Sequence, residues 1–217
     1  MTIYIQGCKF RDWREQEARL KSCGFTDVVP VIDESDYSKT RNEYRLIGVQ
    51  RNFVKIMRMI ADGEDDYPLT CQDDVFFPDP EKIRSAVERD TAFWREHGMK
   101  SILMYYCLRN AKTEKAKASW ALYAKADWQG LYPLFMIFPK ALAVELLKKY
   151  DEEVASEPEN VVWETTPSGK KKVCGEDWFI QRYMKELKIP MYWRFPIMVE
   201  HGNEKSTLGN DGTRREW

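Results

Sequence analysis

Apolar and polar residues follow two different periods along the first half of the chain, and the change of period separates strands from helices. Residues Thr2–Gln6 form a short run with high strand propensity. In Asp12–Ser22, which follows, apolar residues recur at helical spacing. The same order returns with an apolar run at Asp27–Ile32 and a helical segment at Leu46–Ala61, and a third apolar run follows at Tyr67–Cys71. Strands that alternate with helices in this way are typical of an α/β domain with a parallel sheet.

The second half of the chain repeats these patterns in a less regular order. A glycine-containing turn at Pro167–Gly169 predicts a hairpin over Val161–Val173. The other expected helices are Glu81–His97, Lys140–Lys149 and Glu176–Leu187, and the other expected strands are Ser101–Tyr106, Ala121–Ala124, Leu131–Phe138 and Met191–Val199. We therefore expect one α/β domain over residues 1–217, with a mixed, mostly parallel central sheet flanked by helices.

Composition narrows the class of protein. A chain of 217 residues with 43% hydrophobic and 32% charged residues can form a full core and is unlike a disordered chain. The 34 basic and 35 acidic residues nearly cancel, which gives no overall attraction to nucleic acid or to an acidic membrane. Without an apolar segment long enough to span a bilayer, and with five scattered cysteines outside any CxxC pair, the sequence predicts a cytoplasmic protein with reduced thiols.

Two adjacent carboxylates, Asp73 and Asp74, follow the third expected strand directly. In an open α/β sheet, ligands collect beyond the carboxyl ends of the strands. Carboxylate oxygens suit Mg²⁺ or Mn²⁺, which often take one or two carboxylates together with phosphate oxygens. A surface turn is the alternative interpretation, because aspartate is common in turns.

The helix before that strand carries further polar candidates. Gly48 permits a close backbone approach, Arg51 offers a fork of donors for phosphate, and Asn52 can both donate and accept hydrogen bonds. The start of a helix also favours anions. The alternative is that Arg51 and Asn52 lie on a solvated face of the helix.

The order Gly48-x-x-Arg51-Asn52, helix, strand and Gln72-Asp73-Asp74 resembles the nucleotide-sugar half of GT-A type glycosyltransferases, among them small enzymes of bacteriophages and bacteria. The resemblance runs from about Ile3 to Gly209 and departs from the usual Asp-x-Asp-like motif at Gln72. It implies a donor-binding half over about residues 1–75 and an acceptor half over about residues 100–209. It also implies that Asp73 faces the donor ribose or a base-side hydroxyl and that Asp74 holds the Mn²⁺ or Mg²⁺ ion on the diphosphate.

The resemblance implies roles for further residues. Gly175-Glu176-Asp177-Trp178 is similar to the family's Glu-Asp segment, whose aspartate is the general base in inverting members, and His201 opens a His-Gly-x-x-x-Ser pattern that adds a metal ligand. The implied site residues are Asp177 and Glu176 for catalysis; Tyr4, Gln6, Gly7, Arg51, Asn52 and Asp73 for the donor; Asp74 and His201 for the metal; and Trp128, Tyr132 and Trp178 for the acceptor. Taken alone, Asp177 could merely balance a helix dipole, His201 could be a surface residue, and the aromatic residues could be core.

The expected activity is metal-dependent transfer of a sugar from a nucleotide-diphosphate sugar, such as a UDP-sugar, to an acceptor hydroxyl. Inversion is expected if Asp177 lies on the face opposite the diphosphate, and retention is the alternative. The acceptor is a glycan or hydroxymethylated DNA, the latter in the cytoplasm of the host if the protein is phage-encoded. The basic segments Arg109–Lys117 and Lys170–Lys172 could follow DNA phosphates or could be solvated loops. Because Gln72 replaces an acid, a non-catalytic nucleotide-sugar or glycan binding module is an alternative, and a nucleotidyltransferase is a third.

Overall fold

The computed structural model describes residues 1–9, 11–34, 42–106, 122–126, 134–157, 160–165 and 168–201. The central sheet contains β1 (Ile3–Cys8), β2 (Val28–Asp33), β3 (Leu69–Gln72), β5 (Leu103–Met104), β6 (Tyr123–Lys125), β7 (Phe135–Ile137) and β10 (Tyr192–Arg194). The helices are α1 (Trp13–Ser22), α2 (Asn42–Asp62), α3 (Pro80–Glu96), α5 (Lys140–Val154) and α6 (Glu176–Glu186). Two small sheets pair β4 (Val75–Phe76) with β11 (Glu200–His201) and β8 (Trp163–Thr165) with β9 (Lys171–Val173).

The seven strands of the central sheet lie in the order β2-β1-β3-β7-β5-β10-β6. The pairs β2–β1, β1–β3 and β5–β10 are parallel, whereas β7 and β6 run against their neighbours. Five of the seven strands therefore point the same way. The expected mixed, mostly parallel sheet flanked by helices is confirmed.

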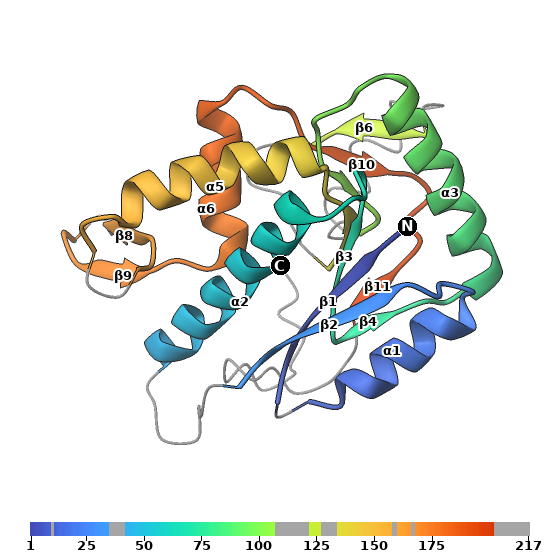
Figure 1. Cartoon of the computed structure of the whole chain (residues 1–217), viewed down its shortest axis with the longest axis horizontal. Coiled ribbons are helices and arrows are strands. Elements are labelled where there is room, and N and C mark those ends of the chain that lie inside the picture. Colours follow the sequence, from blue (N-terminus) through green and yellow to red (C-terminus); the bar gives the residue numbers. More distant parts are fainter. Residues whose placement is uncertain are drawn as a thin grey trace.

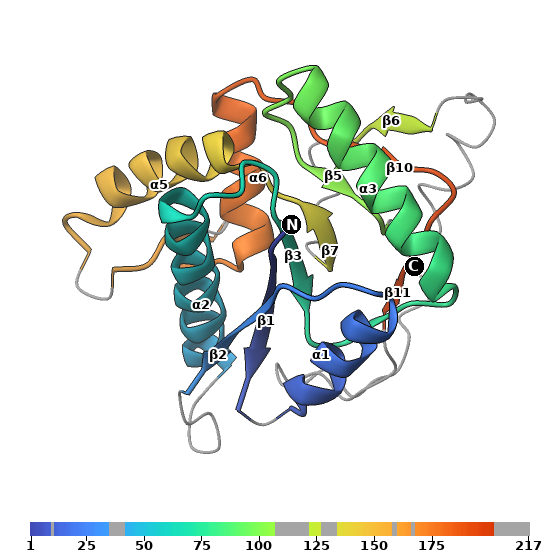
Figure 2. The ribbon, with the colours of Figure 1, turned by 45° about the vertical axis from the view of Figure 1, so that its right-hand side comes forward.

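Helices cover both faces of the sheet (Figures 1 and 2). On β1, Tyr4 contributes to the core beneath α2, α5 and α6, whereas Ile3 and Ile5 contribute to the core beneath α1 and α3. Neighbouring residues on β7 divide in the same way, with Met136 on the first side and Phe135 on the second. This alternation explains why the strands read as continuous apolar runs, since both faces of each strand are buried.

Register places the ends of two strands side by side. Gln6 of β1 pairs with Gln72 of β3, and the backbone N–H of Asp73 donates to the carbonyl oxygen of Gln6 at 3.1 Å. In Figure 2 both strands point to the same edge of the sheet. Because β1 and β3 are parallel, the residues that follow them share that edge, as expected for a ligand site in an α/β fold.

Several elements differ from the expected ones. The pairs of residues that form β4 and β11 were not expected to be strands, and α2 begins at Asn42 rather than Leu46. The predicted hairpin is confirmed as β8–β9. Trp128, Tyr132 and the basic segment 109–117 lie outside the described residues. Within the part of the chain that the structure describes, no helix is both long and apolar enough to cross a membrane.

Candidate functional site

The two aspartates are buried at the edge where β1 and β3 end. Asp73 is 8% exposed and Asp74 is 5% exposed. Two neighbouring buried carboxylates repel each other, and each loses the hydration that stabilises its charge. Burial accordingly raises the pKa of Asp73 above its ordinary value, although the charge of Arg11 opposes that shift. A doublet of this kind needs a positive partner.

Arg11 supplies that partner. Its Nη1 atom lies 2.7 Å from Oδ1 of Asp73 and 2.8 Å from Oδ2 of Asp74, so a single guanidinium nitrogen bridges both carboxylates. Burial lowers the pKa of Arg11, but Asp73 and Asp74 together raise it by more, so the guanidinium stays charged. The remaining oxygen of Asp73 accepts a hydrogen bond from the backbone N–H of Cys8 at 3.2 Å. Sequence reasoning missed Arg11; the available signal was its position just after β1, on the sheet edge that the doublet shares.

His201 reaches the doublet through the small β4–β11 sheet. Antiparallel pairing sets His201 opposite Val75, the residue after the doublet, and its Nε2 atom lies 3.4 Å from Oδ2 of Asp74. The other oxygen of Asp74, Oδ1, is buried and makes no hydrogen bond within the part of the chain that the structure describes. Among the described residues, no three His, Cys, Asp or Glu side chains converge closely enough to form a complete metal site by themselves.

Glu176 joins β1 and β3 to the start of α6. The side-chain amide of Gln72 donates to Oε1 of Glu176 at 3.2 Å, and Gln6 also hydrogen-bonds to this carboxyl group. Burial raises the pKa of Glu176 to about 7, the charge of Asp177 adds to that shift, and the two glutamine hydrogen bonds oppose it. Gln72, the departure from the acidic motif, therefore serves as a hydrogen-bond donor to a buried acid whose protonation changes near neutral pH.

Asp177 lies in the first turn of α6 beside Glu176. Burial raises the pKa of its carboxyl group, and backbone N–H groups at the helix start oppose that shift. A Cβ atom at Gly175 would lie only 2.6 Å from Oδ1 of Asp177, so the lack of a side chain at Gly175 leaves room for this carboxylate. Trp178 is 38% exposed, and the Arg182 guanidinium lies over its ring at 5.1 Å from the centroid. An exposed indole at the start of α6 is compatible with the acceptor role that the resemblance implies.

Asn52 and Gly7 shape the same sheet edge through the backbone. The Asn52 amide donates to the carbonyl oxygens of Gly7 and Val31, each at 3.0 Å, which ties α2 to the ends of β1 and β2. A Cβ atom at Gly7 would lie 3.3 Å from Cβ of Trp13 and 3.4 Å from Oδ2 of Asp73. Gly7 thus allows the chain to pass close to the doublet, and the Asn52 amide is engaged with the protein backbone.

The structure does not bring Tyr4 and Arg51 to the doublet. Tyr4 lies two residues before Gln6 on the same face of β1, and its hydroxyl donates to the carbonyl oxygen of Met59 beneath α2. Arg51 lines a cavity of about 440 Å³ together with residues of α5 such as Tyr150. Neighbouring residues on a helix point about 100° apart, so Arg51 faces α5 while Asn52 faces the sheet. These positions give no support to the expected donor-binding roles of Tyr4 and Arg51.

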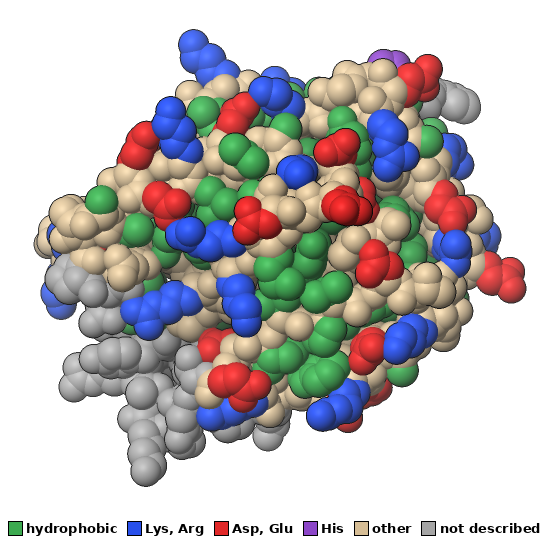
Figure 3. Space-filling model, in the orientation of Figure 1, with side chains coloured by type: hydrophobic (Ala, Val, Ile, Leu, Met, Phe, Trp, Pro, Cys, Tyr) green, Lys and Arg blue, Asp and Glu red, His purple; other side chains and the backbone are tan. Residues whose placement is uncertain are grey.

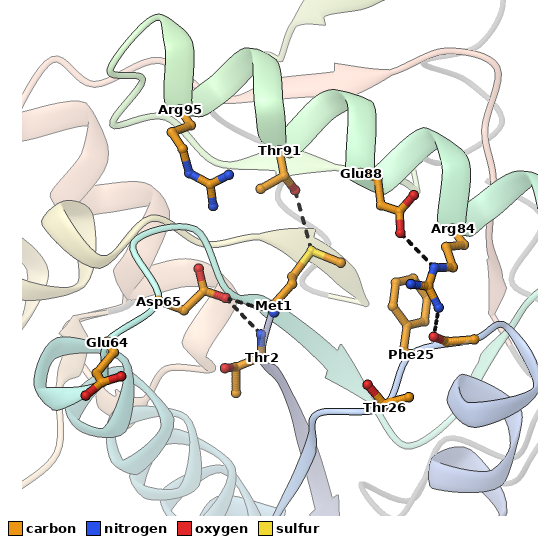
Figure 4. Close-up of a pocket in the computed structure, with 11 residues that line it drawn as sticks. Met1, Thr2, Phe25, Thr26, Glu64, Asp65, Arg84, Glu88, Thr91 and Arg95 are labelled. Atoms are coloured by element: carbon orange, nitrogen blue, oxygen red, sulfur yellow. Dashed lines mark hydrogen bonds and ion pairs between the residues drawn. The ribbon is translucent and has the colours of Figure 1, made fainter.

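A separate cavity of about 590 Å³ opens at the other end of β1 (Figure 4). Thr2 and Asp65 lie inside it, with the Thr2 N–H donating to Asp65 at 2.8 Å, and Arg84 pairs with Glu88 at 2.7 Å. Asp65, Arg84 and Glu88 thus already have partners within the protein. Because the cavity surrounds the start of β1, it lies at the opposite end of that strand from the aspartate doublet.

Figure 3 shows one face of the molecule, on which basic and acidic side chains of the described residues are interspersed. This distribution agrees with the nearly balanced charge of the chain. A surface that binds nucleic acid through its phosphates is dominated by basic groups, and the described part of this face does not have that character.

Comparison with known proteins adds little to this geometry. No protein-family model matches the chain, and no curated protein matches its sequence. Among solved structures, the chain is similar to a glycosyltransferase involved in the glycosylation of the major capsid of PBCV-1, with 15% sequence identity and a TM-score of 0.41. The alignment covers 90% of this chain and 83% of that one. Similarity at this level does not establish a function, so any functional conclusion depends on the side chains of the site.

Proposed function

We propose that the protein is a glycosyltransferase that moves a sugar from a nucleotide-diphosphate sugar to an acceptor hydroxyl. The observation that carries the proposal is the buried aspartate doublet at the common end of β1 and β3, with His201 and the acids of α6 close by. This edge of an α/β sheet is where ligands bind. A doublet that is buried at a cost in stability, and keeps one oxygen without a hydrogen bond, is more consistent with ligand binding than with a surface turn.

The doublet fits a Mg²⁺ or Mn²⁺ ion. Oδ1 of Asp74 is a buried carboxylate oxygen with no hydrogen bond, and His201 adjoins the other oxygen of the same group. These ions need few protein ligands when phosphate oxygens and water complete the shell, so a third acidic side chain is not required. When bound, such an ion would neutralise charge on the departing diphosphate. Asp74 would hold it, with His201 as a further ligand.

Asp177 is the proposed general base. Its carboxylate would take the proton of the acceptor hydroxyl as that oxygen forms a bond to the anomeric carbon, and the bond between that carbon and the nucleoside diphosphate breaks. Attack from the face opposite the diphosphate gives inversion. Glu176 would hold Gln6 and Gln72 in place at the ends of β1 and β3, and its pKa of about 7 makes its charge sensitive to pH near neutrality.

A thermal-shift screen of nucleotide-sugars with and without Mn²⁺ tests the proposal, with UDP-sugars first. A donor at about one hundred times its Kd should raise Tm by about 5 °C or more, and only when Mn²⁺ is present. Asp74→Asn should abolish this joint effect, and Asp177→Asn should bind the donor but lose turnover. The control is Asp151→Asn, which changes an exposed aspartate on α5 that pairs with Arg58. Stabilisation by no nucleotide-sugar would refute the proposal.

The proposed acceptor is a hydroxyl of a glycan or of a hydroxymethylated base in DNA. Transfer of radiolabelled sugar to each acceptor distinguishes the two. Binding to DNA that weakens steeply as salt rises would favour the second, whereas absence of binding at low salt would leave the glycan.

A further inference from the structure

Arg11 neutralises the same pair of carboxylates to which the proposed function assigns a divalent cation. Its Nη1 atom contacts one oxygen from each carboxylate at 2.7 and 2.8 Å, and its side chain is 12% exposed. A Mg²⁺ ion binds carboxylate oxygens at about 2.0–2.1 Å. An ion bound to Asp74 would lie close to the guanidinium, and the two positive charges would repel each other, so binding of one disfavours the other.

We infer that Arg11 is an internal counter-ion that holds the cation position while the donor is absent, and that it leaves this position for the donor diphosphate when a divalent ion enters. This inference rests on the proposed function. It accounts for the contact of one guanidinium nitrogen with both buried carboxylates. It also makes Arg11, rather than Arg51, the arginine of the donor site.

The backbone around Arg11 is held in place by hydrogen bonds that do not involve its side chain. The N–H of Arg11 donates to the carbonyl oxygen of Cys8 at 3.1 Å, and the carbonyl oxygen of Arg11 accepts from Trp13 at 3.0 Å. Asp12 then caps the start of α1, where its side chain accepts from the N–H of Arg14. The proposed movement of the arginine side chain from the doublet to the diphosphate would therefore require no change in these backbone hydrogen bonds.

Charge favours this exchange. Arg11 alone leaves the two carboxylates with one excess negative charge, and the unpartnered Oδ1 of Asp74 lies where a divalent ion would remove that excess. Once an ion neutralises the doublet, the diphosphate still carries negative charge, and a guanidinium binds phosphate oxygens in a bidentate manner. Metal and donor should therefore bind cooperatively, because each favours the position of Arg11 that the other requires.

Mn²⁺ binding without any donor tests the inference, measured as the loss of the free-Mn²⁺ signal in electron paramagnetic resonance. Arg11→Gln should bind Mn²⁺ at least about tenfold more tightly than the wild type, because the position between the aspartates is open and unneutralised. Addition of UDP should tighten Mn²⁺ binding to the wild type far more than to the variant. The control is Arg58→Gln, which removes an exposed arginine paired with Asp151 and should leave Mn²⁺ binding unchanged.

A double variant, Arg11→Gln with Asp73→Asn, has only one buried carboxylate at the doublet to accommodate and is therefore easier to fold than Arg11→Gln alone. It also distinguishes the effect of the guanidinium itself from the effect of net charge at the doublet. It keeps the same net charge at the doublet as the wild type but removes the guanidinium. If occupancy by Arg11 limits metal binding, this variant also binds Mn²⁺ more tightly than the wild type. Equal Mn²⁺ binding by the wild type and the folded variants would overturn the inference, while the proposed function would stand if UDP-sugars still stabilise the wild type with Mn²⁺. Absence of Mn²⁺ binding from every form, with or without UDP, would overturn both.

Discussion

Glu176→Gln should make the protein more stable at alkaline pH while it impairs the site. In the folded protein the pKa of Glu176 is about 7, against an ordinary value of 4.5. Between these two pH values the folded state holds a proton that the unfolded state has released. The free energy of unfolding therefore falls as pH rises through this window, and above pH 7 the full penalty is present. The difference corresponds to about 3 kcal/mol.

Urea unfolding of both forms at intervals from pH 4.5 to 8 measures this effect. The glutamine side chain cannot ionise and can still accept a hydrogen bond from Gln72, so the variant should match the wild type near pH 5 and exceed it by about 1–3 kcal/mol at pH 8. The other titrating groups are common to both proteins and cancel in the difference. Glu186→Gln, at the exposed end of the same helix, is the control. A pH-independent difference between Glu176→Gln and the wild type would refute the reasoning.

Three further substitutions test one position beside the site and two buried polar contacts of the fold. Gly175→Ala should fold but lower turnover about tenfold or more in an initial-rate assay, because the added Cβ displaces the carboxylate of Asp177. Gln50→Leu should lower the free energy of unfolding in urea by about 2–4 kcal/mol. The buried Gln50 amide forms hydrogen bonds with backbone groups just before β8 and just after β9, at the open end of the hairpin. Asp90→Asn should cost about 3–5 kcal/mol by the same measurement, because Arg194 is buried and Asp90 accepts from it at 2.9 Å. A loss below 1 kcal/mol in either stability measurement would contradict the corresponding argument.

Local pattern predicts most of the fold of this chain. Repeated apolar spacing predicts long helices such as α3 and α5. The start of α3 is also indicated by Asp79, which caps the helix, and by Pro80. The strands β4 and β11 contain two residues each, so neither carries any periodicity to detect. Their pairing joins residues more than 120 positions apart, and such a contact follows only from the finished sheet.

The residues of the candidate site likewise differ in whether local sequence or long-range pairing determines their position. Asp73 and Asp74 could be chosen from sequence because they directly follow an expected strand, whereas Glu176 was implied by the resemblance. Arg11 was missed, because its contacts depend on the parallel register of β1 and β3, which brings it to carboxylates 62 and 63 residues away. For Tyr4, sequence indicated the correct strand but not its distance from the edge; two residues span about 7 Å of strand.

The buried polar groups of the site work against the stability of the fold. Glu176 is held where its charge is unfavourable, and one oxygen of Asp74 is buried without a hydrogen bond. Apolar residues of similar size at these positions would be expected to stabilise the sheet edge. Proteins retain such costs at functional sites, where stabilising substitutions commonly reduce activity. Glu176→Gln should therefore raise stability and lower turnover together, and a variant that gained stability at pH 8 with undiminished turnover would show that this acid does not belong to the working site.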